Sequence, residues 1–242
     1  MGAVAGQGRA LPRSAGTLPE HQVRAMFDRI AGVYDRMNSV MTAGMHHRWR
    51  ERAAELSGVG PGDRALDVAT GTGDLAVALK DRVGEGGEVV GVDFSERMLE
   101  LARAKAPDVR FESGNALELP YGDAEFDAVT VGFGARNFAD LRAGLSEMAR
   151  VARPGGRVVV LEITSPERPP LSWFFRLWFD WAVPAFGRVA DSDAYSYLPS
   201  SVRRFPGARA LAGELAAVGL ERVRWVLTAG GIIAIHVGVR PA

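Results

Sequence analysis

The segment that most constrains the fold runs from Arg64 to Asp74, where a short apolar stretch ends in Asp67 and gives way to a turn that contains Gly71 and Gly73. Glycine tolerates positive φ and lets a ligand approach the backbone. The first N–H groups of a helix that follows such a turn point back at the loop. The segment therefore predicts a strand, a tight loop and the start of a helix, with a bound cofactor at the loop.

A second strand is expected at residues 88–92, and it ends at Asp93, twenty residues after Gly73. An acid at this offset commonly accepts hydrogen bonds from the two ribose hydroxyls of a nucleotide. Two adjacent strand ends are thus expected to frame one nucleotide site.

The run from Gly71 to Ala76 also satisfies the G-x-G-x-x-G/A pattern of dinucleotide-binding enzymes. A pyrophosphate favours the bare positive end of a helix, yet Asp67 and Asp74 bracket this loop and would repel it. S-adenosylmethionine has no phosphate, and its sulfonium and ammonium groups would be attracted by the acids. The charges favour this methyl donor over a dinucleotide. An ordinary turn with solvated acids is a third interpretation, which Asp93 at its offset disfavours.

Strands and helices are expected to alternate after the glycine loop. Helices are predicted at residues 74–82, 95–105, 140–152 and 207–218, and strands at 88–92, 109–113, 126–132, 157–163, 221–227 and 231–238. The segment Pro154-Gly155-Gly156 is expected to stop the helix that precedes it. This order predicts an α/β, Rossmann-like fold with a doubly wound, mostly parallel sheet and helices on both faces.

Two further loops should reach the same edge of the sheet, because ligands bind beyond the carboxyl ends of the strands in open α/β sheets. Asn115 and Ala116 follow the third strand. The amide of Asn115 could hydrogen-bond to an adenine edge, with Ala116 beside the ring. Arg136 and Asn137 follow the fourth strand and are expected to face the reaction side. A surface arginine and a turn asparagine are equally compatible with the pattern there.

The N-terminal part is expected to be a helical cap over residues 20–57, preceded by a disordered tail at 1–19. A single methyltransferase domain would then span residues 20–242. The stretch from Tyr34 to Trp49 is rich in polar, aromatic and thioether groups and follows no single amphipathic period. It is interpreted either as a pocket wall or as a surface loop between two helices.

Composition excludes several classes of function. The chain of 242 residues carries 29 basic and 29 acidic residues, so its balanced charge argues against a nucleic-acid partner. It has no cysteine, and its four histidines show no metal-binding spacing, so no metal site is expected. No secretory signal follows the early arginines, and the cytoplasm is the default location.

Residues 171–186 contain seven of the twenty aromatic residues. The segment is shorter than a membrane span and is interrupted by Arg176, Asp180 and Pro184. An apolar lid or a membrane-facing insertion over residues 171–199 is favoured, and a helix buried in the core is the alternative.

Four stretches of the sequence resemble one family. They are the segment around Tyr34-Asp35, Met37-Asn38, His46 and Trp49, the loop from Asp67 to Asp74, the segment from Gly132 to Asn137, and the segment from Arg150 to Thr164. Together they are similar to the ubiquinone and menaquinone biosynthesis C-methyltransferases, over about residues 22–240. One departure is Gly132, where many members place a serine that touches the cofactor.

The resemblance implies a class I methyltransferase fold. It also implies S-adenosylmethionine as donor, held by Thr72, Asp93, Asn115 and Ala116 with the loop glycines Gly71 and Gly73. It implies a polyprenyl quinol as acceptor, methylated at a ring carbon in the last step of menaquinone biosynthesis, which converts reduced 2-demethylmenaquinone to menaquinol. Arg136, Asn137 and Tyr34 would carry the chemistry. A benzoquinol of ubiquinone biosynthesis is the alternative acceptor, and an NAD-dependent oxidoreductase and a non-catalytic quinone-binding protein are more remote. The motifs leave open homo-oligomerisation and peripheral contact with the inner face of the membrane.

Overall fold

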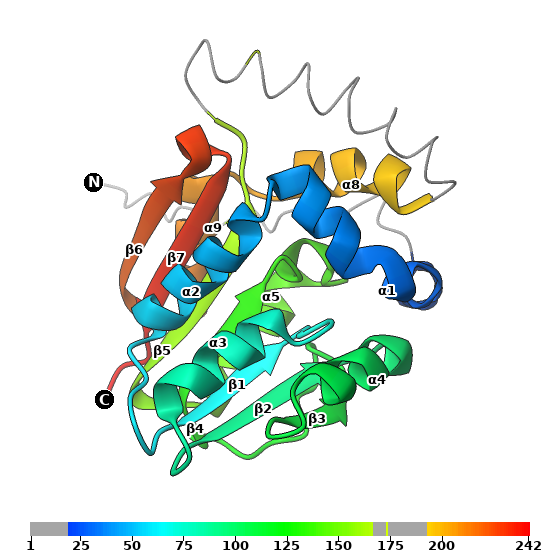
Figure 1. Ribbon diagram of the computed structural model, residues 1–242. Helices are drawn as coiled ribbons and strands as arrows, with labels where there is room; N and C mark the ends of the chain where they lie inside the picture. The colour runs from blue at the N-terminus through cyan, green and yellow to red at the C-terminus, as the bar shows by residue number, and fades with distance from the viewer. Residues whose placement is uncertain (1–18, 167–172, 174–192) are drawn as a thin grey trace, which may run out of the picture.

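A computed structural model describes residues 19–166, 173 and 193–242, and these build one seven-stranded sheet (Figure 1). The strand order is β3-β2-β1-β4-β5-β7-β6. Strands β1 to β5 are all parallel to one another, whereas β7 runs antiparallel to both β5 and β6. The strands are β1 (Arg64–Val68), β2 (Glu88–Asp93), β3 (Arg110–Ser113), β4 (Phe126–Gly132), β5 (Ala152–Ile163), β6 (Glu221–Thr228) and β7 (Ile233–Val239).

Helices cover both faces of the sheet, which confirms the predicted fold class. Helices α2, α3 and α4 pack on one face, and α5 and α9 pack on the other (Figure 1). Their bounds are α1 (Glu20–Thr42), α2 (Met45–Ser57), α3 (Asp74–Val83), α4 (Glu96–Lys105), α5 (Leu141–Val151), α8 (Asp193–Arg204) and α9 (Ala208–Ala217), with short 3-10 turns η1 (Ala135–Asn137) and η3 (Ala229–Gly231).

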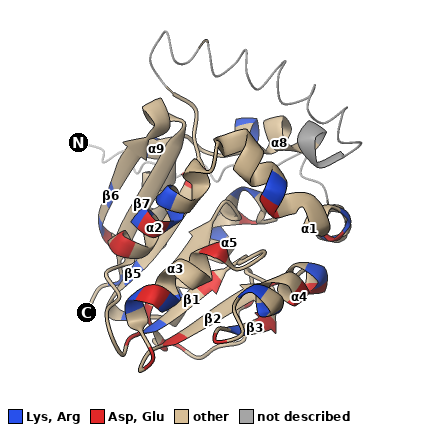
Figure 2. Ribbon diagram, viewed as in Figure 1, with Lys and Arg blue, Asp and Glu red and all other residues tan. Residues whose placement is uncertain are grey.

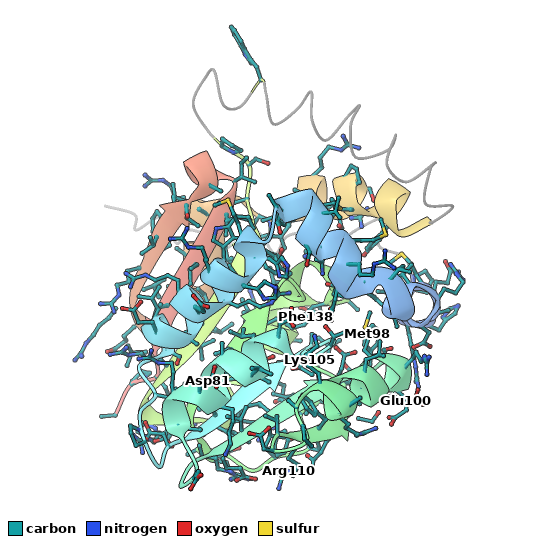
Figure 3. All side chains as sticks on the ribbon, in the orientation of Figure 1. Asp81, Met98, Glu100, Lys105, Arg110 and Phe138 are labelled. Atoms are coloured by element: carbon teal, nitrogen blue, oxygen red, sulfur yellow. The ribbon has the colours of Figure 1, made fainter. Side chains whose placement is uncertain are left out.

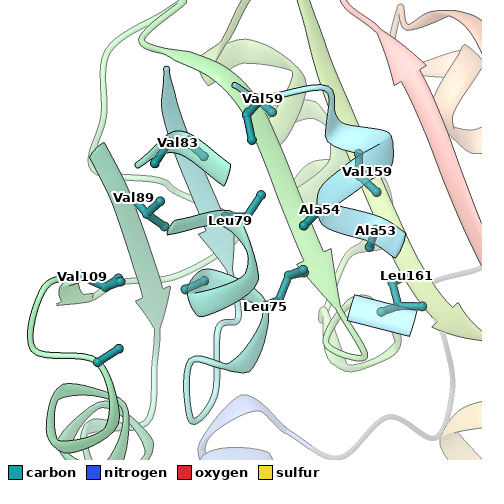
Figure 4. Close-up of a cluster of buried hydrophobic side chains, with 14 of the residues drawn as sticks. Ala53, Ala54, Val59, Leu75, Leu79, Val83, Val89, Val109, Val159 and Leu161 are labelled. Carbon is teal, nitrogen blue, oxygen red and sulfur yellow. The ribbon is translucent and has the colours of Figure 1, made fainter. Parts of the chain in front are cut away.

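The core consists of two apolar layers, one on each side of the sheet. Strand β5 shows why, because its buried residues point alternately to the two sides: Val158 and Val160 to one layer, Val159 and Leu161 to the other. The second of these layers contains Leu79 and its neighbours from α2 and α3 (Figure 4). These layers hold the strand ends rigidly in register.

The N-terminal cap is helical throughout the part that the structure describes, apart from one break. Ala43 and Gly44 both take positive φ, at 48° and 74°, and separate α1 from α2. The stretch from Tyr34 to Trp49 is therefore not a surface loop. Helix α1 packs on α4 and on α8, where Val23 and Met26 form a buried cluster with Tyr197.

Two predicted segments lie largely outside the described residues. The N-terminal tail falls at residues 1–18, and most of the aromatic insertion falls at 167–172 and 174–192. Within the predicted insertion, Trp173 is 68% exposed, and residues 193–199 belong to α8. Whether the insertion is a lid or a membrane-facing segment stays a prediction.

Helix α5 ends at Val151, so the predicted stop before Pro154 is correct. The segment Pro154-Gly155-Gly156 itself lies inside β5, however, where the register with β4 is irregular. Gly155 donates its N–H to Arg240 O, and Gly156 O accepts from Arg240 N. Because it pairs with Arg240 near the C-terminus, the segment that was expected to form a turn is part of a strand.

Basic and acidic residues are intermixed on the helices in the view of Figure 2, in keeping with the balanced charge of the chain. None of the helices within residues 19–166 and 193–242 is long and apolar enough to cross a membrane.

Candidate functional site

A pocket with about 890 Å³ of free space, partly open to solvent, lies at the carboxyl ends of β1, β2 and β4. Helix α1 and the loops beyond these strands enclose it; Met98 and Phe138, which line it, appear between α1 and α4 in Figure 3. Its walls include Phe27 and Tyr34 from α1, Arg50 from α2, Thr70, Gly71 and Thr72 after β1, Asn115, Ala116 and Leu117 after β3, and Phe133, Asn137 and Phe138 after β4.

The glycine loop has the backbone that the sequence predicts. Gly71 and Gly73 have φ of 56° and 84°, a region that favours glycine. A Cβ on Gly73 would come within 2.9 Å of the Phe111 ring, whereas a Cβ on Gly71 would meet no atom within 4 Å. Gly71 thus leaves open space beside the pocket, which suits close approach of a ligand.

Asp93 fixes this loop and faces the pocket. Its Oδ2 accepts the N–H of Gly71 at 2.8 Å and its Oδ1 accepts the N–H of Ser95 at 2.9 Å. Burial raises the pKa of Asp93 to about 6. Each carboxylate oxygen has a further lone pair, so the ribose hydroxyls of a nucleoside could still be accepted.

Asp67 is the second acid of the pocket and is 1% exposed. It accepts hydrogen bonds from Thr70 Oγ1 at 2.6 Å and from Thr130 Oγ1 at 2.8 Å. Burial raises its pKa to about 6, so the carboxyl is largely ionised at neutral pH. A negative group at the end of β1 suits a cationic ligand.

Thr72 lines the pocket, but its hydroxyl is already used. Oγ1 donates to Oδ1 of Asp35 on α1 at 2.6 Å. Lys105 on α4 bridges Asp35 and Asp74 at 2.6 and 2.7 Å. The cofactor loop, α1 and α4 are therefore held together by one polar cluster.

Asn115 and Ala116 also line the pocket, as predicted. The Asn115 side chain shapes its own loop, because Oδ1 accepts the N–H of Leu117 at 2.9 Å. Ala116 and Leu117 add apolar surface on the β3 side, opposite the β4 loop. A planar base fits between such walls.

Two of the three predicted catalytic residues reach the pocket. Tyr34 and Asn137 line it, and Asn137 Oδ1 is buried without a hydrogen-bond partner among the described residues. Phe133 also lines the pocket and has a positive-φ conformation, with φ of 62°. Strained backbone of this kind is concentrated at functional sites.

Arg136 is placed differently from Asn137, because it is not among the pocket-lining residues. Its Nη1 donates to Glu162 Oε1 at 2.8 Å and to Phe133 O at 2.5 Å. The two charged side chains are 9% and 1% exposed, respectively. The predicted role of Arg136 in the chemistry stays a prediction, and the geometry adds a structural partner, Glu162, that the sequence reasoning missed.

Arg50 was not predicted as a pocket residue, although the sequence indicates that it lies on the buried face of its helix. It is three and four residues before Ala53 and Ala54, so it lies on the same face of α2 as these buried alanines. A basic residue on the buried face of a helix is unusual unless it has a partner or a ligand.

These residues fit S-adenosylmethionine. The pocket offers an acid for the ribose, apolar walls for the base, a loop without a side chain at Gly71, and the buried Asp67 for a cationic group. The sequence model of the ubiE/COQ5 methyltransferase family matches residues 16–240. The chain belongs to this family. The predictions of a methyltransferase, and of S-adenosylmethionine as its methyl donor, are confirmed, and the nicotinamide-dependent oxidoreductase is not supported.

Curated relatives in the ubiE/COQ5 family are similar to the chain over nearly its whole length. A demethylmenaquinone methyltransferase of Thermus thermophilus is 46% identical over 222 residues, which cover 89% of the chain and 100% of the relative. A demethylmenaquinone methyltransferase of Bacillus licheniformis is 42% identical over 224 residues, which cover 90% of the chain and 97% of the relative.

Solved structures support the fold of the family at lower identity. The [4+2]-cyclase SpnF is 19% identical with a TM-score of 0.71, over 93% of the chain and 97% of that structure. A methyltransferase from Aquifex aeolicus, described as SAM dependent, is 21% identical with a TM-score of 0.59, over 79% of the chain and 89% of that structure. At this identity the likeness concerns the fold alone.

Proposed function

We propose that the chain methylates a ring carbon of reduced 2-demethylmenaquinone and so produces menaquinol. The proposal is supported by the name shared by relatives that are 42% to 46% identical over about nine-tenths of the chain. The bound donor supplies an electrophilic methyl group on a sulfonium. The ring carbon forms the new bond and loses its proton, and S-adenosylhomocysteine leaves.

The observation that favours a reduced acceptor is Oδ1 of Asn137 in the pocket wall, which has no hydrogen-bond partner among the described residues. A buried acceptor atom gains most from a ligand that donates a hydrogen bond. A quinol carries hydroxyl donors and a quinone carries none. The same distinction holds for reactivity, because only a deprotonated quinol hydroxyl pushes charge onto the ring carbon.

The aromatic walls give the ring its environment. Phe27, Phe133 and Phe138 line the pocket with Tyr34, whose ring meets that of Phe27 edge-on at 6.1 Å. Transfer between a sulfonium and a phenolate neutralises both charges, and a site with little water favours this change. Tyr34 would orient the ring or one of its hydroxyls.

Arg136 would act by holding Asn137 in place. Its bonds to Glu162 and to Phe133 O brace the η1 turn that carries Asn137. A guanidinium remains protonated and does not serve as the base, so a water that it or Asn137 orients would take the hydroxyl proton.

Incubation of the purified full chain with donor and either reduced 2-demethylmenaquinone or the demethylated benzoquinol tests the proposal. Mass spectrometry should find the methylated naphthoquinol as the main product. Preferential methylation of the benzoquinol would move the acceptor to ubiquinone biosynthesis.

A second arm tests the role of Asn137. Asn137→Ala should lower kcat/KM for the quinol about two- to tenfold, the effect of one hydrogen bond, and reduce the binding preference for quinol over quinone. An unchanged preference would remove Asn137 from acceptor recognition.

A further inference from the structure

Among the described residues that line the pocket, Arg50 is the one basic side chain, and it is 6% exposed. Helix α2 packs its alanine face on α3 and the sheet, and this packing places Arg50 in the wall of the pocket. A cation in such a place needs either a complete set of partners or a ligand.

The contacts of the guanidinium within the described residues are incomplete. Nη1 donates to His46 Nδ1 at 2.6 Å and lies 3.5 Å from Asp74 Oδ2. Its Cζ is stacked over the Phe133 ring, 5.3 Å from the centroid, which fixes the plane of the group. Nε and Nη2 make no hydrogen bond to any residue in the described ranges. A planar group with a free edge is suited to a carboxylate.

Neither neighbour neutralises Arg50 fully. Burial, and then the charge of Arg50, lower the pKa of His46 to about 4, so this imidazole is neutral. The Nδ1 atom accepts from Arg50, which leaves the proton on Nε2 to be donated to Ser39 Oγ at 3.2 Å. Against the opposing effect of burial, the charge of Arg50 lowers the pKa of Asp74, but this carboxylate makes its shorter contact, 2.7 Å, with Lys105 and is therefore shared between two cations.

The sheet order fixes which end of the donor lies near Arg50. Asn115 follows β3 and Asp93 ends β2, so the base and ribose belong on that side. The methionine part must then extend over β1 and β4, toward Asp67 and Phe133. This end of the pocket presents one negative and one positive side chain, and the methionine part ends in an ammonium and a carboxylate.

We propose that Arg50 binds the α-carboxylate of the methionine part of S-adenosylmethionine, while Asp67 faces the ammonium group. The inference concerns the donor only and does not depend on the acceptor of the proposed function. Arg50 is thus a cofactor-binding residue on the N-terminal cap, and the cap completes the donor site.

Calorimetry with two donors and no acceptor tests this assignment. Decarboxylated S-adenosylmethionine keeps the adenosine, the sulfonium and the ammonium but lacks the carboxylate. The unchanged chain should bind S-adenosylmethionine about ten- to a hundredfold more tightly than the decarboxylated compound, the effect of one charge-assisted hydrogen-bonded pair. Arg50→Met should weaken the binding of S-adenosylmethionine by a similar factor and change the affinity for the decarboxylated compound by less than about twofold.

Variants on the same helix complete the design. Arg48 is exposed, and Arg48→Met should leave both affinities unchanged. Arg50→Lys keeps the charge and should recover part of the preference. Thermal melting of each variant reports whether folding is intact.

Three outcomes would overturn the assignment: equal affinity of the unchanged chain for both donors, equal weakening of both in Arg50→Met, or unchanged binding of S-adenosylmethionine in that variant. The first is decisive even if Arg50→Met does not fold. Because no acceptor is present, failure of the proposed methylation would leave these binding results intact.

Discussion

Thr72 Oγ1 in the cofactor loop donates a 2.6 Å hydrogen bond to Oδ1 of Asp35 on α1, a residue 37 positions earlier in the chain. The other carboxylate oxygen of Asp35 pairs with Lys105 Nζ at 2.6 Å. The helix that supplies Phe27 and Tyr34 to the pocket is therefore bonded directly to the loop that is expected to hold the donor. The position of α1 and donor binding should be coupled through this contact.

A double-mutant cycle of Thr72→Val and Asp35→Ala tests the coupling. Each single variant should destabilise the chain by about 1 kcal/mol, and the two effects should fail to add by about 0.5 to 1.5 kcal/mol, because they remove the same hydrogen bond. Donor affinity should fall severalfold in both. Urea unfolding and calorimetry provide the measurements.

The exposed pair Arg52 and Glu55 on α2 serves as the control cycle, since both side chains are about half exposed. Its coupling energy should be near zero. Additive effects at Thr72 and Asp35 would show that the contact does not tie the loop to α1.

Asp93→Asn should weaken donor binding about ten- to a hundredfold, because the carboxylate is expected to accept both ribose hydroxyls and already holds the backbone N–H groups of Gly71 and Ser95. Asp81→Asn, at an exposed site on α3, is the matched control (Figure 3). Calorimetry that finds the same donor affinity in both variants would contradict the assignment of Asp93.

Donor binding should depend on pH near 6. Burial raises the pKa values of Asp67 and Asp93 from 3.8 to about 6, so both are largely ionised only above that pH. Affinity for the cationic donor should therefore rise as the pH increases from about 5 to about 7. The neutral analogue 5′-methylthioadenosine should show a weaker dependence, and equal pH profiles for the two ligands would contradict the prediction.

The free energy of unfolding should change in the opposite direction. Between pH 3.8 and about 6, the folded chain retains protons on these carboxyls that the unfolded chain has released. Their contribution to stability is thus present below pH 3.8 and is lost as the pH rises through the folded pKa values. Asp67→Asn should flatten this part of the stability profile, as followed by urea unfolding.

The sequence predicted the fold because its signals are local. Strand ends with acids at a fixed offset, a glycine loop and alternating elements each occupy short windows. The structure has Asp67 and Asp93 at strand ends and Gly71 in the loop, as these signals predict, and all three line the pocket. Where a local signal met a long-range contact, prediction was incomplete. Pro154 and Gly155 signal a turn, but pairing with Arg240 near the C-terminus places them in β5.

The site was predicted in part for the same reason. Tyr34 and Asn137 reach the pocket because strand ends and helix faces direct them there. The position of Arg50 depends on the break at Ala43 and Gly44, which turns α2 back onto the sheet. The alanines of α2 indicate which face of the helix is buried, but they do not specify the angle at this break. Arg136 likewise turns toward Glu162, a residue 26 positions later.

The pair of Arg136 and Glu162 gives the last prediction. Both side chains are nearly buried, so removal of one partner leaves an uncompensated charge inside the chain. Arg136→Met should destabilise the chain by about 3 to 5 kcal/mol, whereas Arg142→Met, in an exposed pair with Glu214, should change stability by about 1 kcal/mol at most. The double variant Arg136→Met/Glu162→Leu should recover most of the stability, since apolar side chains can replace a buried pair. Turnover should stay low in the double variant, because the bond to Phe133 O that braces Asn137 is not restored.

Arg136→Lys should also lower kcat with little change in donor affinity, because lysine keeps the charge but loses the planar group. Full turnover in Arg136→Lys, measured beside calorimetric donor binding, would show that neither the chemistry nor the position of Asn137 needs the guanidinium.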